Sequence, residues 1–227
     1  ISLLMGGLLV AGCAQDNNAT ASTSVPTTPA AQMRAGRFID GPVSGLSYDT
    51  DTAVGQLTGP QGEFQYPDGS RTRFYVGLAD LGTVSGGDYI TPMTLAGGDA
   101  SNRAAINRAR LLLALDADAD ASNGIQISND ERTRAQNYVG SLPINFDMPT
   151  DQFGAEGGLA DNFVEWVLNR ETNVASAQDA QTELQKAQDQ ISRGQVNRLP
   201  AADAGAAQSV AAGSVVTLNG SASSDPD

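Results

Sequence analysis

Three aspartates, Asp116, Asp118 and Asp120, stand at alternate positions between an apolar stretch and the turn dipeptide Asn123-Gly124. Carboxylates at alternate positions of a turn point in one direction, and Ca²⁺ is bound by several converging oxygen atoms. Close carboxylates also repel one another, and a cation removes that repulsion. We therefore predict a structural calcium site whose ligands are Asp116, Asp118 and Asp120, with Asn123 or a backbone carbonyl beside them.

A second interpretation of this segment needs no metal. In the helix–loop–helix calcium pattern, a loop that starts at Asp116 places Ile127 at the last ligand position, and an isoleucine side chain has no oxygen. Later registers fail at other positions. Asn-Gly favours a turn in any case, and Glu131 can close a capping box with Ser128. A weak structural calcium site and an acidic turn without metal both stay open.

The composition excludes several classes of function. The chain has 227 residues and no histidine, so it cannot form a Ser-His-Asp system, a Cys-His system or a histidine zinc site. Its 13 basic and 26 acidic side chains give a net charge of -13, which repels the phosphates of nucleic acids. Acid–base chemistry by Asp or Glu and oxygen-ligand metal sites are still allowed. We predict no catalytic residue and no nucleic-acid partner.

The N-terminal residues have the pattern of an export signal. Residues 1–12 are mostly apolar, close on small residues and are much shorter than a membrane span. The sequence "LLVAGC" resembles a bacterial lipobox, which implies that Cys13 is lipidated and becomes the mature N-terminus. Acyl chains on Cys13 imply durable anchoring to a bilayer. Ala14 in place of aspartate implies the outer membrane, by the sorting pattern of that family. An ordinary signal peptide with an incidental cysteine is the alternative.

Changes in composition divide the chain into segments. A stretch rich in Ala, Ser, Thr, Asn and Pro predicts a disordered tether, short apolar runs between turn residues predict strands, and helical periodicity follows. The predicted fold class is α+β: a small antiparallel β-sandwich or sheet, about four helices, and the first strands of a truncated β-sandwich repeat. The predicted segments are a signal peptide (1–12), lipidated cysteine and tether (13–35), β-domain (36–97), helical region (98–194), linker (195–200) and repeat start (201–227).

The β region carries a family resemblance. Its opening "DGPVSGLSY", followed by "GQLTGPQGEFQY", resembles the carboxypeptidase regulatory-like family of small transthyretin-like β-domains, which implies structural support without chemistry. Asp40, Asp49 and Asp51 are interpreted as turn residues. Arg71 and Arg73 are interpreted as a solvated hairpin tip. The side chains expected in its core are Phe38, Val43, Leu46, Tyr48, Leu57, Phe64, Tyr66, Phe74, Val76 and Leu81.

Four helices are predicted after the β region. The first has Ser101 as its N-cap, and the second has the capping box of Ser128 and Glu131. The third covers 158–170 and the fourth 176–192. One-sided apolar faces are expected in three of them. These faces are Ala105, Ile106, Ala109, Leu112 and Leu113 in the first; Leu159, Phe163, Trp166 and Val167 in the third; and Ala180, Leu184, Ala187 and Ile191 in the fourth.

Trp166 is the only tryptophan of the chain, and Glu165 stands beside it. An exposed pair of this kind would suit a carbohydrate platform or an acid. A single tryptophan on the apolar stripe of an amphipathic helix, however, favours a place in the core. We therefore predict that Trp166 is buried.

The last segment, "AADAGAAQSVAAGSVVTLNGSASSDPD" (201–227), resembles the start of a polycystic-kidney-disease (PKD) type or related immunoglobulin-like repeat. This resemblance implies the first strands of a sandwich, with Val215, Val216 and Leu218 facing its core. It also implies that the chain is a fragment of a longer precursor. The matching positions are Ala202 to Gly205, Val210, Gly213, Val216, Leu218, Gly220, Ser221, Ser223, Asp225, Pro226 and Asp227.

The resemblances together imply a non-catalytic, outer-membrane-anchored surface lipoprotein, facing the periplasm or the cell surface. It would act in adhesion, polymer binding or presentation of distal PKD-like modules. Its partners would be the membrane, through the acyl anchor, and an extracellular polysaccharide or protein. The alternative is the N-terminal accessory region of a secreted modular protease or polysaccharide-degrading hydrolase, whose catalytic domain lies beyond residue 227. Calcium would stiffen the aspartate turn rather than take part in chemistry.

Overall fold

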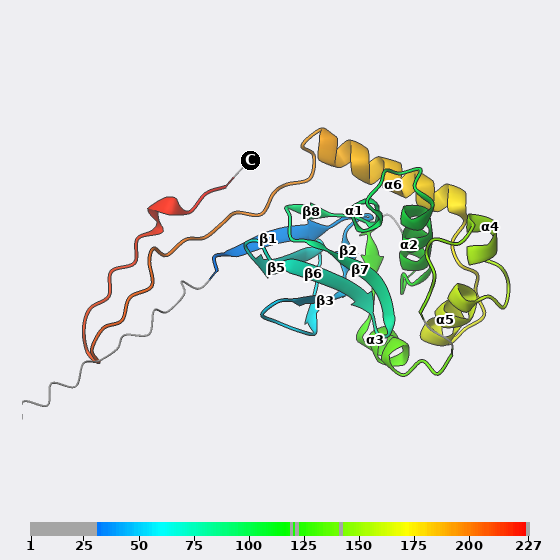
Figure 1. The fold of residues 1–227 in the computed structure, drawn as a ribbon, viewed down its shortest axis with the longest axis horizontal. Coiled ribbons are helices and arrows are strands. Elements are labelled where there is room, and N and C mark those ends of the chain that lie inside the picture. Colours follow the sequence, from blue (N-terminus) through cyan, green and yellow to red (C-terminus); the bar gives the residue numbers. More distant parts are fainter. Residues whose placement is uncertain (1–30, 119, 121–122, 141–142, 226–227) are drawn as a thin grey trace, which may run out of the picture. The chain divides into compact units, whose positions relative to one another are not determined.

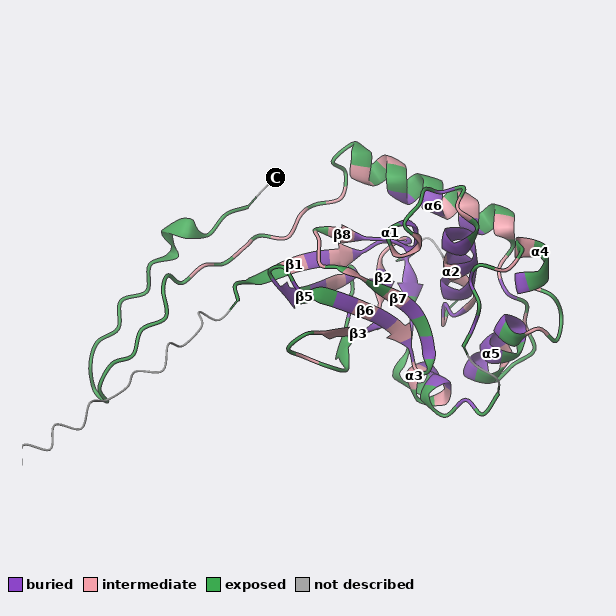
Figure 2. Ribbon diagram, viewed as in Figure 1, coloured by how far each residue is buried: buried purple, intermediate pink, exposed green. Residues whose placement is uncertain are grey.

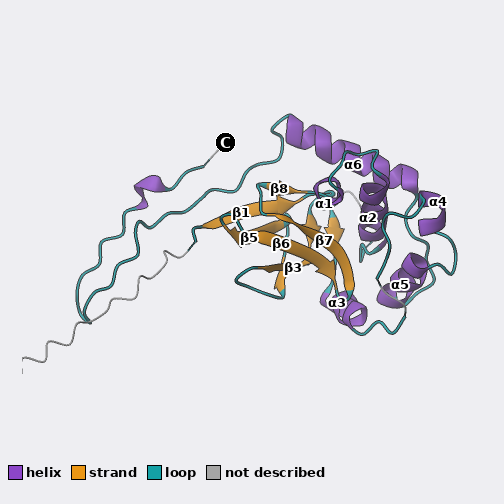
Figure 3. Ribbon diagram, viewed as in Figure 1, coloured by secondary structure: helices purple, strands orange, loops and turns teal. Residues whose placement is uncertain are grey.

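The computed structural model describes residues 31–118, 120, 123–140 and 143–225. The predicted signal peptide, the predicted lipidation site Cys13 and most of the predicted tether lie outside these residues, as do Pro226 and Asp227. The described residues form one unit that contains both strands and helices, so the predicted α+β class is confirmed (Figures 1 and 3). No helix in the described part of the chain is both long and apolar enough to cross a bilayer.

Two sheets and a short parallel pair make up the β region. Neighbouring strands are antiparallel, except that β1 is parallel to β8 and β2 to β9. The first sheet has the order β5 (Glu63–Pro67), β1 (Met33–Phe38), β8 (Tyr89–Ile90). The second has the order β4 (Gln56–Leu57), β3 (Ser47–Thr50), β6 (Arg71–Val76), β7 (Ala79–Ser85). The parallel pair is β2 (Val43–Ser44) with β9 (Ile125–Gln126).

An aromatic cluster joins the two sheets. Phe38 and Phe64 of the first sheet contact Phe74 of the second, with ring centroids 4.9 and 5.2 Å apart, and Tyr48 lies edge-on to Phe64 at 5.7 Å. Such tilted and edge-to-face pairs add to the free energy gained by burying the rings. The predicted core positions of the β region are buried as expected, apart from Leu57 on the edge strand β4, which is 45 % exposed.

Six α-helices and one short 3₁₀ turn lie in the described residues. Their bounds are α1 (Pro92–Ala96), α2 (Arg103–Ala114), α3 (Asn129–Gln136), α4 (Thr150–Phe153), α5 (Leu159–Leu168), α6 (Ala177–Ser192) and η2 (Gly220–Ala222). The capping box of Ser128 and Glu131 is confirmed at the start of α3. The predicted N-cap Ser101 is wrong, because Asn102 accepts the first amides of α2 while the Ser101 hydroxyl donates to Asp99.

Helix α2 is buried on two sides, whereas the sequence predicted one apolar face. Ala105 and Ala109 pack with α6, while Leu111, Leu112 and the following Leu115 belong to the cluster that contains the strands. Figure 2 accordingly shows buried residues along most of α2. A helix covered on both sides must also bury polar side chains, and each of these needs hydrogen-bond partners.

Arg110 is the buried cation of α2. Its Nε donates to the carbonyl of Ala175 at 2.6 Å and its Nη1 donates to the carbonyl of Thr150, while the guanidinium lies over the ring of Phe153. Burial lowers the pKa of the Arg110 guanidinium. The side chain thus joins α2 to the start of α4 and to the chain just before α6.

Two neighbours of Arg110 hold other carbonyls in the same way. Asn107 Nδ2 donates to Phe146 at 2.8 Å and to Met148 at 2.9 Å. Arg108 Nε donates to Leu81 of β7 at 2.6 Å, and its guanidinium lies 4.7 Å from the centre of the Phe146 ring. Because their partners are backbone groups in two separate segments, β7 and the connection at residues 146–148, these side chains fix the connections around α2.

Residues 201–225 do not form the strands expected of a sandwich. The described residues show one isolated bridge, between Ala201 and Ser224, and the turn η2. Val215 is 93 % exposed and Leu218 is 69 % exposed. A pair of isolated strands is marginal in water, and the described residues supply no second layer on which these apolar side chains pack.

Replacing Arg110 tests how far its hydrogen bonds to the carbonyls of Thr150 and Ala175 stabilise the fold. We expect Arg110→Met to lower the free energy of unfolding by about 3 kcal/mol, because two buried carbonyls lose charge-assisted donors. Denaturant unfolding followed by circular dichroism measures the change. The control is Arg103→Met at the exposed start of the same helix, with an expected change within about 0.5 kcal/mol. Equal unfolding midpoints for the two variants would contradict this stabilising role of Arg110.

Candidate functional site

The predicted calcium ligands lie in a turn in which the carboxylates accept hydrogen bonds from nearby amides. Asp116 is buried, and its Oδ1 accepts the amide of Gln126 at 2.9 Å. Asp118 is exposed, and its carboxylate accepts from the Asn123 side-chain amide at 2.9 Å, from the Gln126 side-chain amide at 3.1 Å and from the Asp120 backbone at 3.0 Å. Asp118 and Asn123 are therefore brought together, but as acceptor and donor of one hydrogen bond.

The protonation of the two carboxyls differs. Burial, followed by the charge of Asp118, raises the pKa of Asp116, and the hydrogen bond from Asn123 lowers the pKa of Asp118. In the described part of the chain, no three Asp, Glu or Cys side chains lie close enough together to hold one metal ion. Amide donors satisfy Asp118, so a calcium ion would have to displace them.

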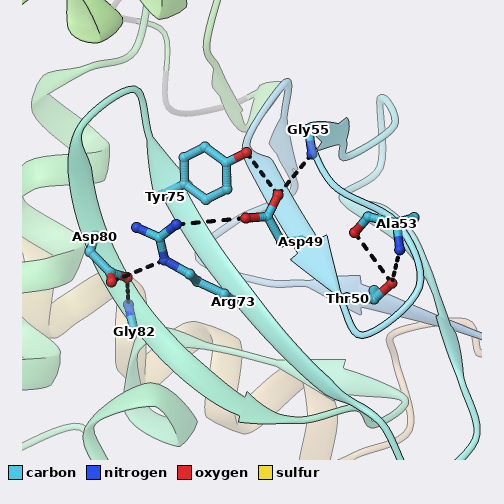
Figure 4. Close-up of polar contacts among 8 residues, drawn as sticks. All are labelled: Asp49, Thr50, Ala53, Gly55, Arg73, Tyr75, Asp80 and Gly82. Atoms are coloured by element: carbon cyan, nitrogen blue, oxygen red, sulfur yellow. Dashed lines mark hydrogen bonds and ion pairs between the residues drawn. The ribbon is translucent and has the colours of Figure 1, made fainter.

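A polar network covers the outer face of the second sheet (Figure 4). Arg73 lies between Asp49 of β3 and Asp80 of β7, with nitrogen–oxygen distances of 3.6 and 3.0 Å. The Tyr75 hydroxyl donates to Asp49 Oδ1 at 2.9 Å, and burial, followed by this bond, raises the pKa of Tyr75. The interpretations of Asp49 as a turn residue and Arg73 as part of a hairpin tip are wrong, because both lie within strands.

This network stabilises the sheet rather than forming a site. Arg73, Tyr75 and the two aspartates all have partners within it, and the Arg73 guanidinium also lies 4.8 Å from the centre of the Tyr75 ring. The Arg73 and Asp80 side chains are each more than two-fifths exposed, so solvent screens their attraction. A ligand would have to compete with contacts that already exist.

Asp40 is a buried carboxyl at the turn between β1 and β2. It is 1 % exposed, and neither of its oxygens has a hydrogen-bond partner among the described residues. Burial, followed by the negative charge of Glu183 on α6, raises its pKa from 3.8 to about 8. The sequence pattern placed Asp40 correctly in a turn but gave no sign of this burial.

Trp166 is exposed, so the prediction that it belongs to the core is wrong. The buried face of α5 consists of Ala160, Phe163, Val164 and Val167 with their neighbours. Trp166 is 42 % exposed and Leu159, seven residues earlier, is 43 % exposed. Residues seven apart lie on one line along a helix, and this line forms the edge of the apolar stripe.

Contacts between α3 and α5 fix the orientation of the indole ring. The Trp166 Nε1 donates to the carbonyl of Arg134 at 2.9 Å, and the Arg134 Nε donates back to the carbonyl of Val167. Tyr138 lies edge-on to the indole with ring centroids 6.0 Å apart. The exposed face of the ring is therefore held in place before any ligand arrives.

The turn between β6 and β7 positions α3. Gly77 in this turn has a φ of +55°, and a Cβ there would lie 2.3 Å from the backbone carbon of Ala135. A residue with a side chain would thus be strained and would push the end of α3 away. The sheet consequently sets the place of Arg134, next to Ala135 in the chain.

A groove surrounds Trp166, with a volume of about 430 Å³. Helix α5 ends at Asn169, whose φ of +52° is left-handed, and this reversal returns the chain past the indole. We call this feature the Trp166 groove. Its lining residues are Arg134, Asn137, Glu165, Trp166, Asn169, Arg170 and Glu171. The sequence pattern indicated Glu165 and Trp166 as a pair but gave no sign of the other five, which come from two separate segments.

A second cavity, of about 530 Å³, adjoins the Trp166 groove through Glu165 and Glu171. Glu156 and Asp161 also line it, so we call it the acidic cavity. The groove thus combines an aromatic ring with groups of both charges, whereas the cavity is lined by four carboxylates. These functional interpretations rest on geometry, because comparisons of the chain with protein-family models, curated proteins and solved structures found no match.

The raised pKa of Asp40 predicts how stability depends on pH. Between about pH 4 and pH 8 the folded protein keeps a proton that the unfolded chain has released, so stability falls across this window as pH rises. We expect Asp40→Asn to remove this dependence of the unfolding free energy on pH. The variant should be more stable at pH 8 by about 5 kcal/mol at most, with little gain at pH 4. The unfolding free energies of the variant and of the unaltered chain at pH 4 and at pH 8 measure this gain.

The exposed Asp88 supplies the control for this experiment. Asp88→Asn makes the same chemical replacement but lies on the surface, so its effect should stay within about 0.5 kcal/mol at either pH. An equal gain from Asp40→Asn at pH 4 and at pH 8 would show that the carboxyl does not titrate as described.

Calcium binding at the aspartate turn stays a prediction. An ion would require Asn123 to turn its amide oxygen inward and to give up its bond to Asp118. We expect EGTA to lower the melting temperature of the purified chain, and Asp118→Asn to abolish this response, because a ligand of the folded state stabilises it by mass action. Scanning calorimetry measures both. A melting temperature unchanged by EGTA would contradict calcium binding.

Proposed function

We propose that this chain is a non-catalytic lipoprotein that binds a polysaccharide in the Trp166 groove. The single observation that carries the proposal is an exposed tryptophan, fixed by its hydrogen bond to Arg134 and its edge contact with Tyr138, in a groove lined by amide and charged side chains. Its volume of about 430 Å³ falls in the range of roughly 300–1,000 Å³ seen for small-ligand sites. A few sugar units of a longer polymer would fill it.

The chemistry of the groove favours a carbohydrate. A sugar ring presents a flat C–H face, which packs on an indole and is attracted by its π-electrons. Its hydroxyls both donate and accept hydrogen bonds, and the groove offers both functions. Asn137 and Asn169 can do either, Arg170 donates and Glu171 accepts. A polyanion fits less well, because two glutamates offset the two arginines and the chain carries a net charge of -13.

The location follows from the N-terminal resemblance. Acyl chains on Cys13 would hold the protein at the outer membrane, facing the periplasm or the cell surface, where polysaccharides are abundant. The exposed apolar side chains of 201–225 support the reading of this segment as the start of a PKD-like module. In this arrangement the chain binds polymer close to the membrane and presents distal modules beyond it, and calcium would stiffen the aspartate turn.

Replacing Trp166 tests polysaccharide binding. We expect Trp166→Ala to weaken retention on chitin or cellulose at least about tenfold, because the stacking surface is removed. Pull-down isotherms measure the affinity, and quenching of the single tryptophan by soluble oligosaccharides measures it independently in the unaltered chain. Release of reducing ends from the polymers is assayed in parallel, and none is expected.

Leu159→Ala is the matched control. Leu159 lies on the same helix with nearly the same exposure as Trp166, but it does not line the groove. Its replacement should leave binding unchanged. If Trp166→Ala, shown by circular dichroism to be folded, binds as well as Leu159→Ala, the groove is not the polysaccharide site. Binding of peptides but not of any glycan would assign the groove to a protein partner instead.

A further inference from the structure

The acidic cavity is chemically different from the rest of the surface around α5. Glu156, Asp161, Glu165 and Glu171 line it together with Thr172 and Asn173, and none of its lining residues is basic. Four carboxylates around one space repel one another, and a bound cation relieves this repulsion. The lining comes from α5 and from the segments before and after it, so the cavity is formed by folding.

Asp161 gives a second and independent indication of a ligand. It is 2 % exposed, and its Oδ2 accepts the amide of Gly157 at 2.9 Å. Its Oδ1 is also buried but has no hydrogen-bond partner among the described residues. A buried polar atom without a partner is costly, and native structures rarely keep one.

The position of Asp161 in the helix explains only part of this arrangement. It lies in the first turn of α5, where the positive end of the helix dipole favours a negative charge. The bond from Gly157 uses one oxygen in that role. The unpartnered oxygen and the three further carboxylates of the cavity have no such explanation.

We propose that the acidic cavity binds a divalent cation of the magnesium type, which keeps most of its water shell. Asp161 supplies the carboxylate that contacts the ion directly, and Glu156, Glu165 and Glu171 accept hydrogen bonds from its water molecules. Mg²⁺ is commonly held in this way, by one or two carboxylates with several waters retained. This mode agrees with the spacing of the acidic residues, because no three of those described can ligate one ion directly.

The volume and the setting of the cavity suit a hydrated ion. About 530 Å³ leaves room for the ion and its waters, which a bare-ion site would not need. Glu165 and Glu171 also form the wall shared with the Trp166 groove. The cation site goes beyond the proposed polysaccharide binding and does not rest on it.

Magnesium titration of the purified chain tests the site. The buffer contains EGTA, so that calcium at the aspartate turn does not contribute, and ionic strength is held constant with NaCl. We expect saturable binding of MgCl₂ by calorimetry and a rise in melting temperature of about 3–6 °C at ten times the dissociation constant. Asp161→Asn keeps the shape of the side chain and the bond from Gly157, and it should weaken binding at least about tenfold.

Two further variants make the result decisive. Asp151→Asn removes an exposed aspartate from the first turn of α4, outside the cavity, and should leave binding unchanged. Glu171→Gln, outside any helix, should weaken binding even if Asp161→Asn fails to fold. Absence of saturable Mg²⁺ binding, or binding to both Asp161→Asn and Glu171→Gln with wild-type affinity, would overturn the proposal. Loss of binding in Asp118→Asn alone would move the site to the aspartate turn.

Discussion

The hydrogen bonds of Arg110 fix both ends of the segment that forms the candidate sites. One guanidinium nitrogen holds the carbonyl of Thr150 and another holds that of Ala175. Between these two points lie α4, α5, the residues of the acidic cavity and most residues of the Trp166 groove. Helix α2 can carry a buried arginine because those carbonyls accept its hydrogen bonds. The geometry of the sites therefore depends on a helix that does not line them.

A second anchor acts on the other side of the groove. The glycine turn between β6 and β7 allows α3 to approach the sheet, and α3 then exchanges hydrogen bonds with α5 through Arg134 and Trp166. Groups that are held from two directions lose little conformational entropy when a ligand binds. This preorganisation is what distinguishes Trp166 from Leu159, which is equally exposed but lines neither the groove nor the acidic cavity.

The sequence pattern predicted those features of the fold that depend on a few consecutive residues. The alternation of apolar residues located most strands of the β region, but not β9, which lies in the predicted helical region, or the start of β1, which lies in the predicted tether. The Ser128–Glu131 spacing located the start of α3, because a capping box needs only four consecutive residues. Asn102 replaced Ser101 as N-cap because Asp99 accepts the serine hydroxyl. The two buried sides of α2 and the exposure of Trp166 depend on which elements pack against each helix, and periodicity along one helix does not contain that information.

The same distinction applies to the acidic residues. The regularly spaced aspartates of the turn are not the carboxylates that lack hydrogen-bond donors. Asp118, in the aspartate run, is satisfied by amide donors from its own turn. Asp40 is buried without a donor and responds by holding a proton, as its raised pKa indicates. Asp161 has one oxygen bonded and one oxygen unpartnered, beside three more carboxylates. A cation gains most where carboxylates lack hydrogen-bond donors, so we expect the acidic cavity, rather than the aspartate turn, to be the stronger cation site.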